Sequence, residues 1–476
     1  MPYVSTRDGR PRPERVEFEE VLLRGLAPDG GLYLPDQWPS LSTAALRALR
    51  GRPYAEVAAR VMGPFLGHAV TPARLAQILA ESYADFDQEA VAPLRQIAPD
   101  LWLLELFHGP TLAFKDYALQ LVGRLFDEVL ARRGGRVTII GATSGDTGSA
   151  AIAATRDRAT ADIFMLYPEG RISDIQRRQM TTVVSANVHA IGIAGSFDDC
   201  QDLVKAMFAD APFRAAHNLS AVNSINWARI MAQTVYYVVA ALALGAPERR
   251  VSFTVPTGNF GNVYAAHVAK RMGLPIERLV VATNRNDILA RFFNDGTMSL
   301  RPVEPSLSPS MDIQVSSNFE RLLFELRGRD GRAVADAMTR FRASGALPVS
   351  EGELSQARDE FSAYACDDDA TRAEIARTWR RDGILLDPHG AVGMAAARTH
   401  MAQNKETGIP MIVLATAHPA KFPDAIEQAI GVRPVLPPRL ADVMERPERL
   451  VRLKNDITAV KEYVRAHARP QRGVAA

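Results

Sequence analysis

The sequence has few cysteines, no long apolar run and no excess of either charge. Its two cysteines, Cys200 and Cys366, show neither metal-ligand spacing nor a disulfide framework, as is typical of a reducing compartment. The longest apolar run, residues 235–246, is too short to span a bilayer and predicts a buried helix. A net charge of +2, from 56 basic and 54 acidic residues, does not favour a general binder of nucleic acid or membrane surfaces.

The first residues also lack a targeting pattern. Residues 1–8 contain no apolar core of the kind that a secretory signal requires, and Asp8 and Glu14 are untypical of a transit peptide. We therefore expect a soluble cytoplasmic protein. The 476 residues suffice for two or three domains, and 47% hydrophobic residues are ordinary for a globular protein.

The pattern along the chain changes near residue 100. Residues 1–95 are predicted to form a mainly helical N-terminal domain, with a helix near 71–84. Beyond them, short β-rich runs alternate with Ala-rich helical stretches, which predicts an α/β fold with a largely parallel sheet. Residues 300–380 depart from this alternation and are interpreted as an insertion at the rim, and 446–472 as a basic surface helix with a frayed tail.

Polar turns follow four of the predicted strands. In open α/β sheets ligands bind at the carboxyl ends of the strands, so these turns are expected to converge on one crevice. Tight turns are also needed for purely structural reasons, which explains the glycines but not the Thr, Ser, Asn and Asp beside them. The four strands are predicted at Val137–Gly141, Val251–Val255, Ile384–Leu386 and Met411–Ala415.

A lysine stands among small and apolar residues in the segment Phe107-His-Gly-Pro-Thr-Leu-Ala-Phe-Lys115, just after a predicted strand. Burial disfavours the charged form of an amine, and a neutral lysine condenses with an aldehyde to give a Schiff base. Lys115 is therefore a candidate cofactor anchor. Most lysines near apolar residues only extend their stems over a core, so this assignment depends on the other loops.

The loop Gly258-Asn-Phe-Gly-Asn262 follows a strand and opens a helix predicted at 263–272. Its backbone amides are placed where the helix dipole is positive, and its glycines let the backbone close around an anion, so the loop could hold a phosphate. It lacks the spacing of a dinucleotide fingerprint and the Gly-Lys-Ser/Thr of a P-loop, and a simple turn remains the alternative.

Two further segments offer groups for anions. Thr143-Ser-Gly-Asp-Thr147 begins a helix with hydroxyls and amides suited to a carboxylate or a phenolic oxygen, although the same residues are ordinary helix caps. Asn223-Ser-Ile-Asn-Trp-Ala-Arg229 adds an arginine that suits a phosphate or carboxylate, although a lone arginine is more often a surface ion-pair partner. Thr416, at a strand end, could bond a ring nitrogen or act as a cap.

Three histidines, His108, His389 and His418, lie in these loops and titrate near neutral pH. Their contexts differ and no local two-histidine spacing is present, so we expect polar wall residues and no metal site.

Taken together, the motifs resemble those of threonine synthase, a family of pyridoxal-phosphate enzymes with the tryptophan-synthase-β-like fold (fold type II). The resemblance covers nearly the whole chain, and its long N-terminal region is similar to the longer branch found in bacteria and fungi. The shorter branch has Asn where this chain has Asp146. The motifs that carry the resemblance are Tyr3-Val-Ser-Thr-Arg7, Gly25-Leu-Ala-Pro-Asp-Gly-Gly-Leu-Tyr33, the Lys115 segment, Ser144-Gly-Asp-Thr-Gly148, Ser224-Ile-Asn-Trp-Ala-Arg229, Gly258-Asn-Phe-Gly-Asn262, Asp387-Pro-His-Gly390 and Thr416-Ala-His-Pro-Ala-Lys-Phe422.

The resemblance implies a role for each matching residue. Lys115 becomes the catalytic lysine that forms the Schiff base with pyridoxal 5'-phosphate, and Thr416 faces the pyridine nitrogen. The remaining cofactor-binding residues are then Gly258, Asn259, Phe260, Gly261, Asn262 and Asp146. The substrate carboxylate is assigned to Thr143, Ser144 and Thr147, and the substrate phosphate to Asn223, Ser224 and Arg229.

The resemblance also implies the reaction and the domains. The expected activity converts O-phospho-L-homoserine and water into L-threonine and phosphate, with no nucleic acid, membrane or obligate protein partner. A large cofactor domain is expected from residues 96–134 and 216–476, and a small mobile domain from 135–215 that controls water. A threonine-synthase-like phospho-lyase that releases 2-oxobutyrate, and a catalytically silent protein that binds an anionic metabolite, are the alternatives.

Overall fold

The computed structural model describes residues 1–221, 224–404 and 408–470. The chain divides into two units, one of residues 1–108 and 224–434 and the other of residues 109–223 and 435–476. The predicted small domain, 135–215, falls within the second unit, which also takes in residues 109–134. The predicted domain boundaries themselves stay a prediction.

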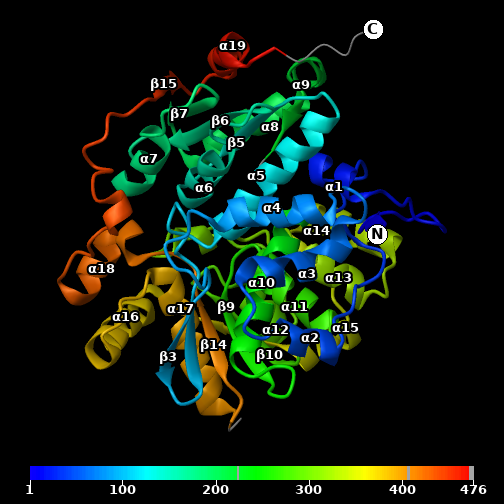
Figure 1. The fold of residues 1–476 in the computed structure, drawn as a ribbon, viewed down its shortest axis with the longest axis vertical. Helices are drawn as coiled ribbons and strands as arrows, with labels where there is room; N and C mark the ends of the chain where they lie inside the picture. Colours follow the sequence, from blue (N-terminus) through cyan, green and yellow to red (C-terminus); the bar gives the residue numbers. More distant parts are fainter. Residues whose placement is uncertain (222–223, 405–407, 471–476) are drawn as a thin grey trace. The chain divides into compact units, whose positions relative to one another are not determined.

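A six-stranded sheet organises the first unit (Figure 1). Its order is β13-β10-β9-β14-β4-β3, and every neighbouring pair is parallel except the antiparallel hairpin of β3 and β4. The largely parallel order confirms the predicted fold class. The strands are β3 (Leu94–Ala98), β4 (Leu101–Glu105), β9 (Val251–Pro256), β10 (Ile276–Thr283), β13 (Phe361–Ala365) and β14 (Met411–Ala415).

The central strands are apolar because both faces of the sheet are covered. Every residue of β9 and of β14 is buried, as expected for parallel strands between helices. Val280 of β10 and Val413 of β14 pack with Val392 of α17 (Pro388–Gln403) in one core. Figure 1 shows α17 on one side of this sheet and α10 (Trp227–Ala243) and α11 (Gly261–Arg271) on the other.

The N-terminal part of the first unit is mainly helical, with one short antiparallel pair, β1 (Tyr3–Ser5) and β2 (Tyr33–Pro35). The helix predicted at 71–84 is α4 (Pro72–Tyr83), which Thr71 caps and Pro72 begins. The apolar run 235–246 lies mostly within the buried α10, as predicted. The other helices here are α1 (Phe18–Arg24), α2 (Thr43–Leu49) and α3 (Tyr54–Leu66).

The strand predicted at Ile384–Leu386 is wrong. These residues form no strand and lie between Gly383, which ends the preceding helix with φ 63°, and Asp387, which caps α17. Ile384 and Leu386 are buried in the core beside α17. Their apolar character therefore reflects burial of a short connection, not pairing in the sheet. The strands predicted at 137–141, 251–255 and 411–415 are confirmed as β5 (Val137–Ala142), β9 and β14.

Residues 300–380, interpreted from the sequence as an insertion at the rim, also contribute a strand to the main sheet of the first unit. β13 pairs in parallel with β10, so this stretch supplies an edge strand of the main sheet. Its other elements, with the helix that precedes it and the last two of this unit, are α12 (Ile288–Asp295), β11 (Met298–Ser299), η1 (Pro309–Met311), α13 (Phe319–Leu326), α14 (Gly331–Ser344), β12 (Ala346–Leu347), α15 (Glu351–Glu360), α16 (Asp368–Asp382), η2 (Pro419–Lys421) and α18 (Pro423–Ile430).

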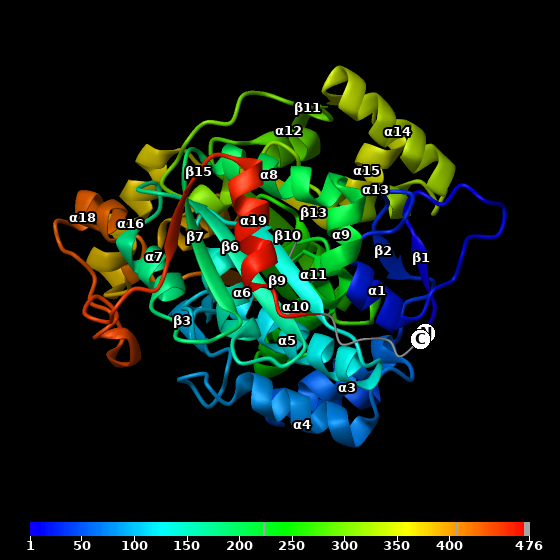
Figure 2. The same ribbon diagram turned by 90° about the horizontal axis from the view of Figure 1, so that it is seen from above.

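A five-stranded parallel sheet, ordered β15-β7-β6-β5-β8, organises the second unit. The predicted C-terminal helix is α19 (Ile457–His467), whose Val460 and Val464 pack with Cys200 of α8 (Phe197–Ala209) in the core of this unit. Figure 2 shows α19 over the strands of this sheet. The remaining elements are α5 (Lys115–Arg132), α6 (Asp146–Thr155), β6 (Ala161–Pro168), α7 (Asp174–Thr181), β7 (Val188–Ala194), α9 (Ala211–His217), β8 (Leu219–Ser220), η3 (Pro438–Leu440) and β15 (Val451–Lys454).

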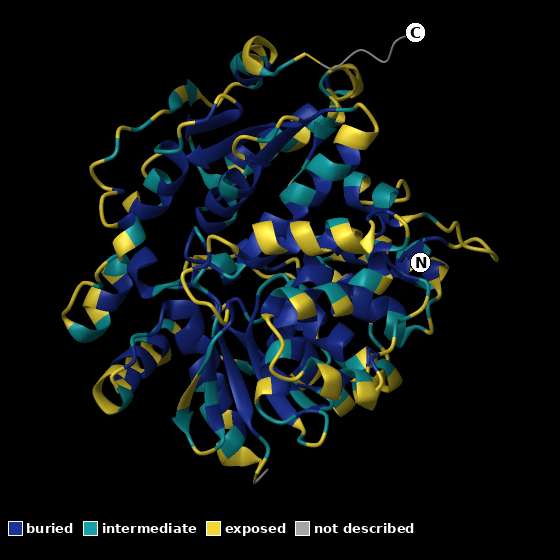
Figure 3. Cartoon of the chain, viewed as in Figure 1, coloured by how far each residue is buried: buried dark blue, intermediate teal, exposed yellow. Residues whose placement is uncertain are grey.

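Burial follows the elements (Figure 3): β9 and β14 are buried along their length, whereas the outward residues of α4 are exposed. Among the described residues, no helix combines the length and the apolar character needed to cross a membrane.

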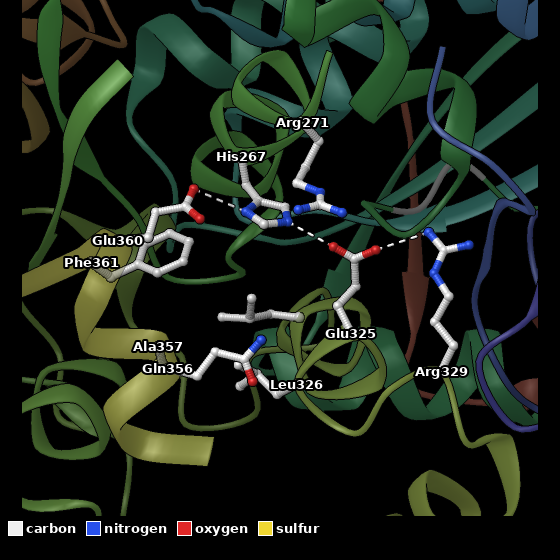
Figure 4. Close-up of a pocket in the computed structure, with 10 residues that line it drawn as sticks. His267, Arg271, Glu325, Leu326, Arg329, Gln356, Ala357, Glu360 and Phe361 are labelled. Carbon is white, nitrogen blue, oxygen red and sulfur yellow. Dashed lines mark hydrogen bonds and ion pairs between the residues drawn. The ribbon is translucent and has the colours of Figure 1, made fainter. Parts of the chain in front are cut away.

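A buried histidine between two glutamates holds α11 to its neighbours (Figure 4). The His267 ring nitrogens lie 2.8 Å from Glu325 of α13 and 2.9 Å from Glu360 of α15. The two carboxylates outweigh burial and raise the pKa of His267 to about 9, and the pKa of Glu325 falls to about 2. Together with Arg271 and Arg329 these residues line a pocket of about 190 Å³.

Replacing His267 with Gln is expected to reduce the loss of stability at high pH. The folded-state pKa, about 9, lies above the ordinary 6.5, so the imidazolium contribution is complete below pH 6.5 and is lost as the pH rises through about 9. That loss amounts to about 3 kcal/mol. The melting temperature at pH 6.5 and 9.5 should therefore fall further for the native chain than for His267→Gln.

His400→Gln is the matched control for this experiment. Burial lowers the pKa of His400 to about 4, so its ring stays neutral throughout the range. This variant should show the same fall as the native chain. An equal fall in His267→Gln would contradict the charged state assigned to His267.

Candidate active site

Lys115 is the first residue of α5 in the second unit and is buried, with 8% of its surface exposed. Its Nζ lies 3.6 Å from Asp146 Oδ2 and 5.8 Å from the centre of the Phe114 ring. The amine is therefore buried beside a carboxylate.

Asp146 is held in place by its neighbours. It begins α6 directly after Gly145, and its Oδ1 accepts a hydrogen bond of 3.0 Å from Gln176 Nε2. The carboxylate is buried, with 5% exposure of the residue. One oxygen is thus used for anchoring, and the other points toward Lys115.

The loop before α6 is shaped by Thr143. Its Oγ1 accepts hydrogen bonds from Gly145 N at 3.0 Å and Gly148 N at 2.8 Å, so this oxygen closes the loop on itself. Ser144 and Thr147 are half-buried, and their side chains make no hydrogen bond with the described residues. Their hydroxyls are available to a ligand.

In the first unit, the loop Gly258–Asn262 leads from β9 into α11, which begins at Gly261, two residues before the predicted start. Phe260 has φ 59°, a left-handed conformation that costs a non-glycine residue about 1–2 kcal/mol. Its ring is fully buried, 5.4 Å from Phe319. The amides of Gly261 and Asn262 lie in the first helical turn, where the helix provides no acceptor for them. Packing thus stabilises a loop whose N–H groups suit an anion.

Two tyrosines orient the side chain of Asn262. Tyr236 and Tyr237, both in α10, donate their hydroxyl hydrogens to Asn262 Oδ1, the latter at 2.7 Å. Asn262 Nδ2 is consequently fixed, and it is buried with no acceptor among the described residues. A buried amide left in this state is costly, and a phosphate oxygen would satisfy it.

Residues 316–318 hold the same loop from the other side. Ser316 Oγ donates to Gly258 O at 2.8 Å, and Ser317 N donates to Asn259 Oδ1 at 2.8 Å. Asn318 Nδ2 donates to Asn259 O at 3.0 Å. A Cβ on Gly258 would lie 3.0 Å from the Met311 Cα, so this close approach requires glycine.

The structure brings two of the predicted ligand segments together. Asn259 Nδ2 donates a hydrogen bond to Ser224 Oγ, so the candidate cofactor loop and the candidate substrate-phosphate segment are in contact. Arg229 is buried in α10, and burial lowers its pKa to about 10, which leaves the guanidinium charged at neutral pH. Asn223 lies outside the described residues.

Thr416 follows β14 and is buried, and its hydroxyl makes no hydrogen bond within the described ranges. Asp387 caps α17 and holds His389 Nδ1 at 2.7 Å, and His389 Nε2 accepts from Ser310 N at 3.3 Å. Asp387 therefore orients His389, and His389 holds the turn at η1 (Pro309–Met311). Met311 of this turn lies against Gly258.

The other two histidines have structural partners. His108 lies 2.9 Å from both Asp87 and Glu105, and the ring of His418 packs edge-on against Phe107. No group of His, Cys, Asp or Glu in the part of the chain that the structure describes could hold a metal ion.

Several residues that shape this site were not predicted from the sequence. Ser316 and Asn318 fell in the segment interpreted as an insertion, and the signal for them was a run of small polar residues directly before a helix. Tyr236 and Tyr237 fell in an apolar run, where two hydroxyls that need partners were the only sign. Nothing in the sequence distinguished Arg321, which donates to Asn318 Oδ1, from other helical arginines.

These features define the class of protein. Considered separately, a buried lysine at a helix start suits the aldehyde of pyridoxal 5'-phosphate, and a loop with helix-start amides suits a phosphate. The family of pyridoxal-phosphate-dependent enzymes matches residues 88–341. Residues 2–83 match the threonine synthase N terminus, and residues 390–464 the threonine synthase C-terminal region.

Known proteins agree over the full length. A threonine synthase of Pseudomonas aeruginosa is 54% identical over 468 residues, 98% of each chain. The crystal structure of pyridoxal-phosphate-bound threonine synthase from Brucella melitensis has 55% identity and a TM-score of 0.95, covering 98% of this chain and all of the other. Threonine synthase from yeast has 39% identity and a TM-score of 0.94, covering 98% of each. The chain belongs to the threonine synthase family.

Gly145→Ala is expected to distort the turn that places Asp146. Gly145 has φ 133°, and an added Cβ would lie 2.5 Å from the Gln176 side chain. The strained backbone alone should cost about 1–3 kcal/mol. Thermal melting should show a clear loss of stability, whereas Gly135→Ala, whose Cβ would meet Leu130 at an ordinary 3.5 Å, should not. Equal melting temperatures for both variants would contradict this account.

Proposed function

We propose that the protein is a threonine synthase that converts O-phospho-L-homoserine and water into L-threonine and phosphate, the last step of threonine biosynthesis. The observation that carries the proposal is the agreement with threonine synthases along the whole chain, from the N-terminal region through the cofactor domain to the C-terminal region. Similarity confined to the cofactor domain would support only the broader class.

The cofactor supplies an aldehyde that joins an amine and a ring that withdraws electrons from the substrate carbon next to that amine. The proposed anchor is Lys115, and Gly258 to Asn262 are proposed to hold the cofactor phosphate through backbone amides and Asn262 Nδ2. Thr416 is proposed to donate to or accept from the ring nitrogen, and a neutral hydroxyl there does not hold that nitrogen protonated.

Lys115 has a second proposed role once its amine is free. Nζ accepts a proton from the substrate α-carbon and later returns one, as a general base and acid. Asp146 stabilises the protonated amine between these steps, because its carboxylate lies 3.6 Å from Nζ. The position of Asp146 beside the lysine supports this proposed cofactor-side role.

Separate groups are proposed for the two ends of the substrate. Ser144 and Thr147, with the loop that Thr143 closes, suit the substrate carboxylate. The substrate phosphate is assigned to Ser224 and Arg229, with Asn223. A charged guanidinium that holds the phosphate both orients the substrate and stabilises the leaving group.

Closure of residues 135–215 as a mobile domain remains part of the proposal, because water must reach the substrate only after phosphate has left.

We also propose a cytoplasmic location. Cys200 and Cys366 form no disulfide and are buried, which supports a reducing compartment. The balanced charge supports action on a small molecule without a nucleic-acid or membrane partner.

The test is incubation of the cofactor-loaded protein with O-phospho-L-homoserine, with threonine, 2-oxobutyrate and phosphate quantified together. Threonine equal to phosphate is the expected result, because a synthase returns the carbon skeleton with a hydroxyl group in place of phosphate. Lys115→Ala should lose at least about a thousandfold in rate, since it removes both the anchor and the base.

The other outcomes separate the alternatives. Phosphate with 2-oxobutyrate and no threonine would replace the synthase by the phospho-lyase. Cofactor binding without any phosphate release would contradict both and favour a silent binding protein. Lys115→Arg is a matched control that keeps the charge and should be equally inactive.

A further inference from the structure

A fully buried arginine, Arg321 in α13, joins three segments of the first unit. Its Nε donates to Tyr33 O at 2.9 Å, its Nη2 donates to Ile225 O at 2.6 Å, and its Nη1 donates to Asn318 Oδ1. Its relative exposure is 0%. These three hydrogen bonds run to the N-terminal region, to the residue after Ser224, and to the residue that holds Asn259.

The guanidinium is suited to this task by its geometry. Its N–H groups form a rigid planar fork, so three acceptors bound to it are fixed relative to one another. Burial lowers the pKa of Arg321 to about 10, and the group remains charged at neutral pH. All three hydrogen bonds go to neutral oxygens, which a charged donor holds more tightly than a neutral one. The charge lies 5.8 Å from the Trp227 ring.

Asn318 passes this constraint on to the ligand loops. Because Arg321 donates to Asn318 Oδ1, the amide Nδ2 must point the other way, where it donates to Asn259 O at 3.0 Å and Ser224 O at 3.1 Å. Asn318 N adds a bond of 3.2 Å to Asn259 O. Arg321 at the oxygen end and the two carbonyl acceptors at the nitrogen end therefore hold the Asn318 amide in one orientation.

The N-terminal region secures the same helix. Glu320, next to Arg321, forms an ion pair of 2.6 Å with Arg7 and accepts a hydrogen bond of 2.6 Å from Thr6 Oγ1. Glu320 and Arg7 are largely buried, with side-chain exposures of 4% and 9%. The first 35 residues therefore contact α13 at two adjacent residues, Glu320 and Arg321.

We infer that Arg321 is a positioning residue for phosphate recognition. By fixing the amide of Asn318, it sets Asn259 and Ser224, and hence the loop proposed to hold the cofactor phosphate and the segment proposed to hold the substrate phosphate. Arg321 itself touches neither ligand. The inference rests on the proposed function, because it assumes that Gly258 to Asn262 bind the cofactor phosphate.

The experiment compares two ligands of the cofactor-free protein, pyridoxal phosphate and pyridoxal, which differ only in the phosphate group. Arg321→Lys keeps the charge and the apolar stem, but its single ammonium cannot serve three diverging acceptors. The dissociation constant of pyridoxal phosphate, measured by absorbance titration, should rise about tenfold, as expected when a charge-assisted bond in the support of the loop is lost. That of pyridoxal should change less than about twofold.

Arg291→Lys is the matched control. Arg291 is also buried in a helix and donates to Asp287, Ser299 Oγ and Ser299 O, none of which belongs to the ligand loops. Its substitution should cost stability and leave the ratio of the two dissociation constants unchanged. Asn318→Asp serves as a second variant, because it keeps an acceptor for Arg321 and loses the donor to Asn259 and Ser224. It should show the same selective loss of pyridoxal phosphate.

Each result decides a different point. An unchanged ratio in Arg321→Lys and Asn318→Asp would overturn the inference, even if both variants melt earlier. An equal loss for both ligands would also overturn it, because the role would then be structural. Equal affinities of the native chain for pyridoxal phosphate and pyridoxal would instead contradict the proposed phosphate loop. Should Arg321→Lys fail to fold, Asn318→Asp decides the question.

Discussion

The charged fork of Arg321 is the constraint on which the rest of the first unit's candidate site depends. A buried guanidinium is expensive to desolvate, and it is retained here because three oxygens from separate segments surround it. Asn318 converts that arrangement into a fixed amide that bonds Asn259 and Ser224. These contacts thus fix the loop at the start of α11 before a ligand binds. Preorganisation of this kind reduces the free-energy cost of binding.

The same loop also contains a strained backbone residue and a buried hydrogen-bond donor without an acceptor. Phe260 adopts a left-handed backbone, held by aromatic packing around its ring, and Asn262 keeps a buried N–H without an acceptor among the described residues. Both features cost stability in the free protein, and an anion at the helix start would supply the acceptor that Asn262 Nδ2 lacks. In the second unit, the Lys115 amine is buried 3.6 Å from the Asp146 carboxylate.

Local sequence patterns predicted the strands, turns and helices, but they did not predict the features that depend on long-range contacts. Strand, turn and helix patterns located β5, β9 and β14, and the turn residues that follow them, because apolar runs bounded by glycine and small polar residues have few other structures. The same reasoning failed at Ile384–Leu386, where apolar residues fill a core without pairing. Residues far apart in the chain, such as Tyr33 and Arg321, come into contact only when the chain folds. No local sequence pattern predicts such a contact. The roles given to single site residues remain proposals.

The most direct test of the account is a crystal structure of the protein with pyridoxal phosphate. The account predicts that the phosphate accepts hydrogen bonds from Asn262 Nδ2 and from the amides that begin α11. It also predicts that Arg321, Asn318 and Asn259 keep the contacts described for them. A phosphate bound elsewhere, or a loop that rebuilds its contacts with Asn318 on binding, would contradict the account.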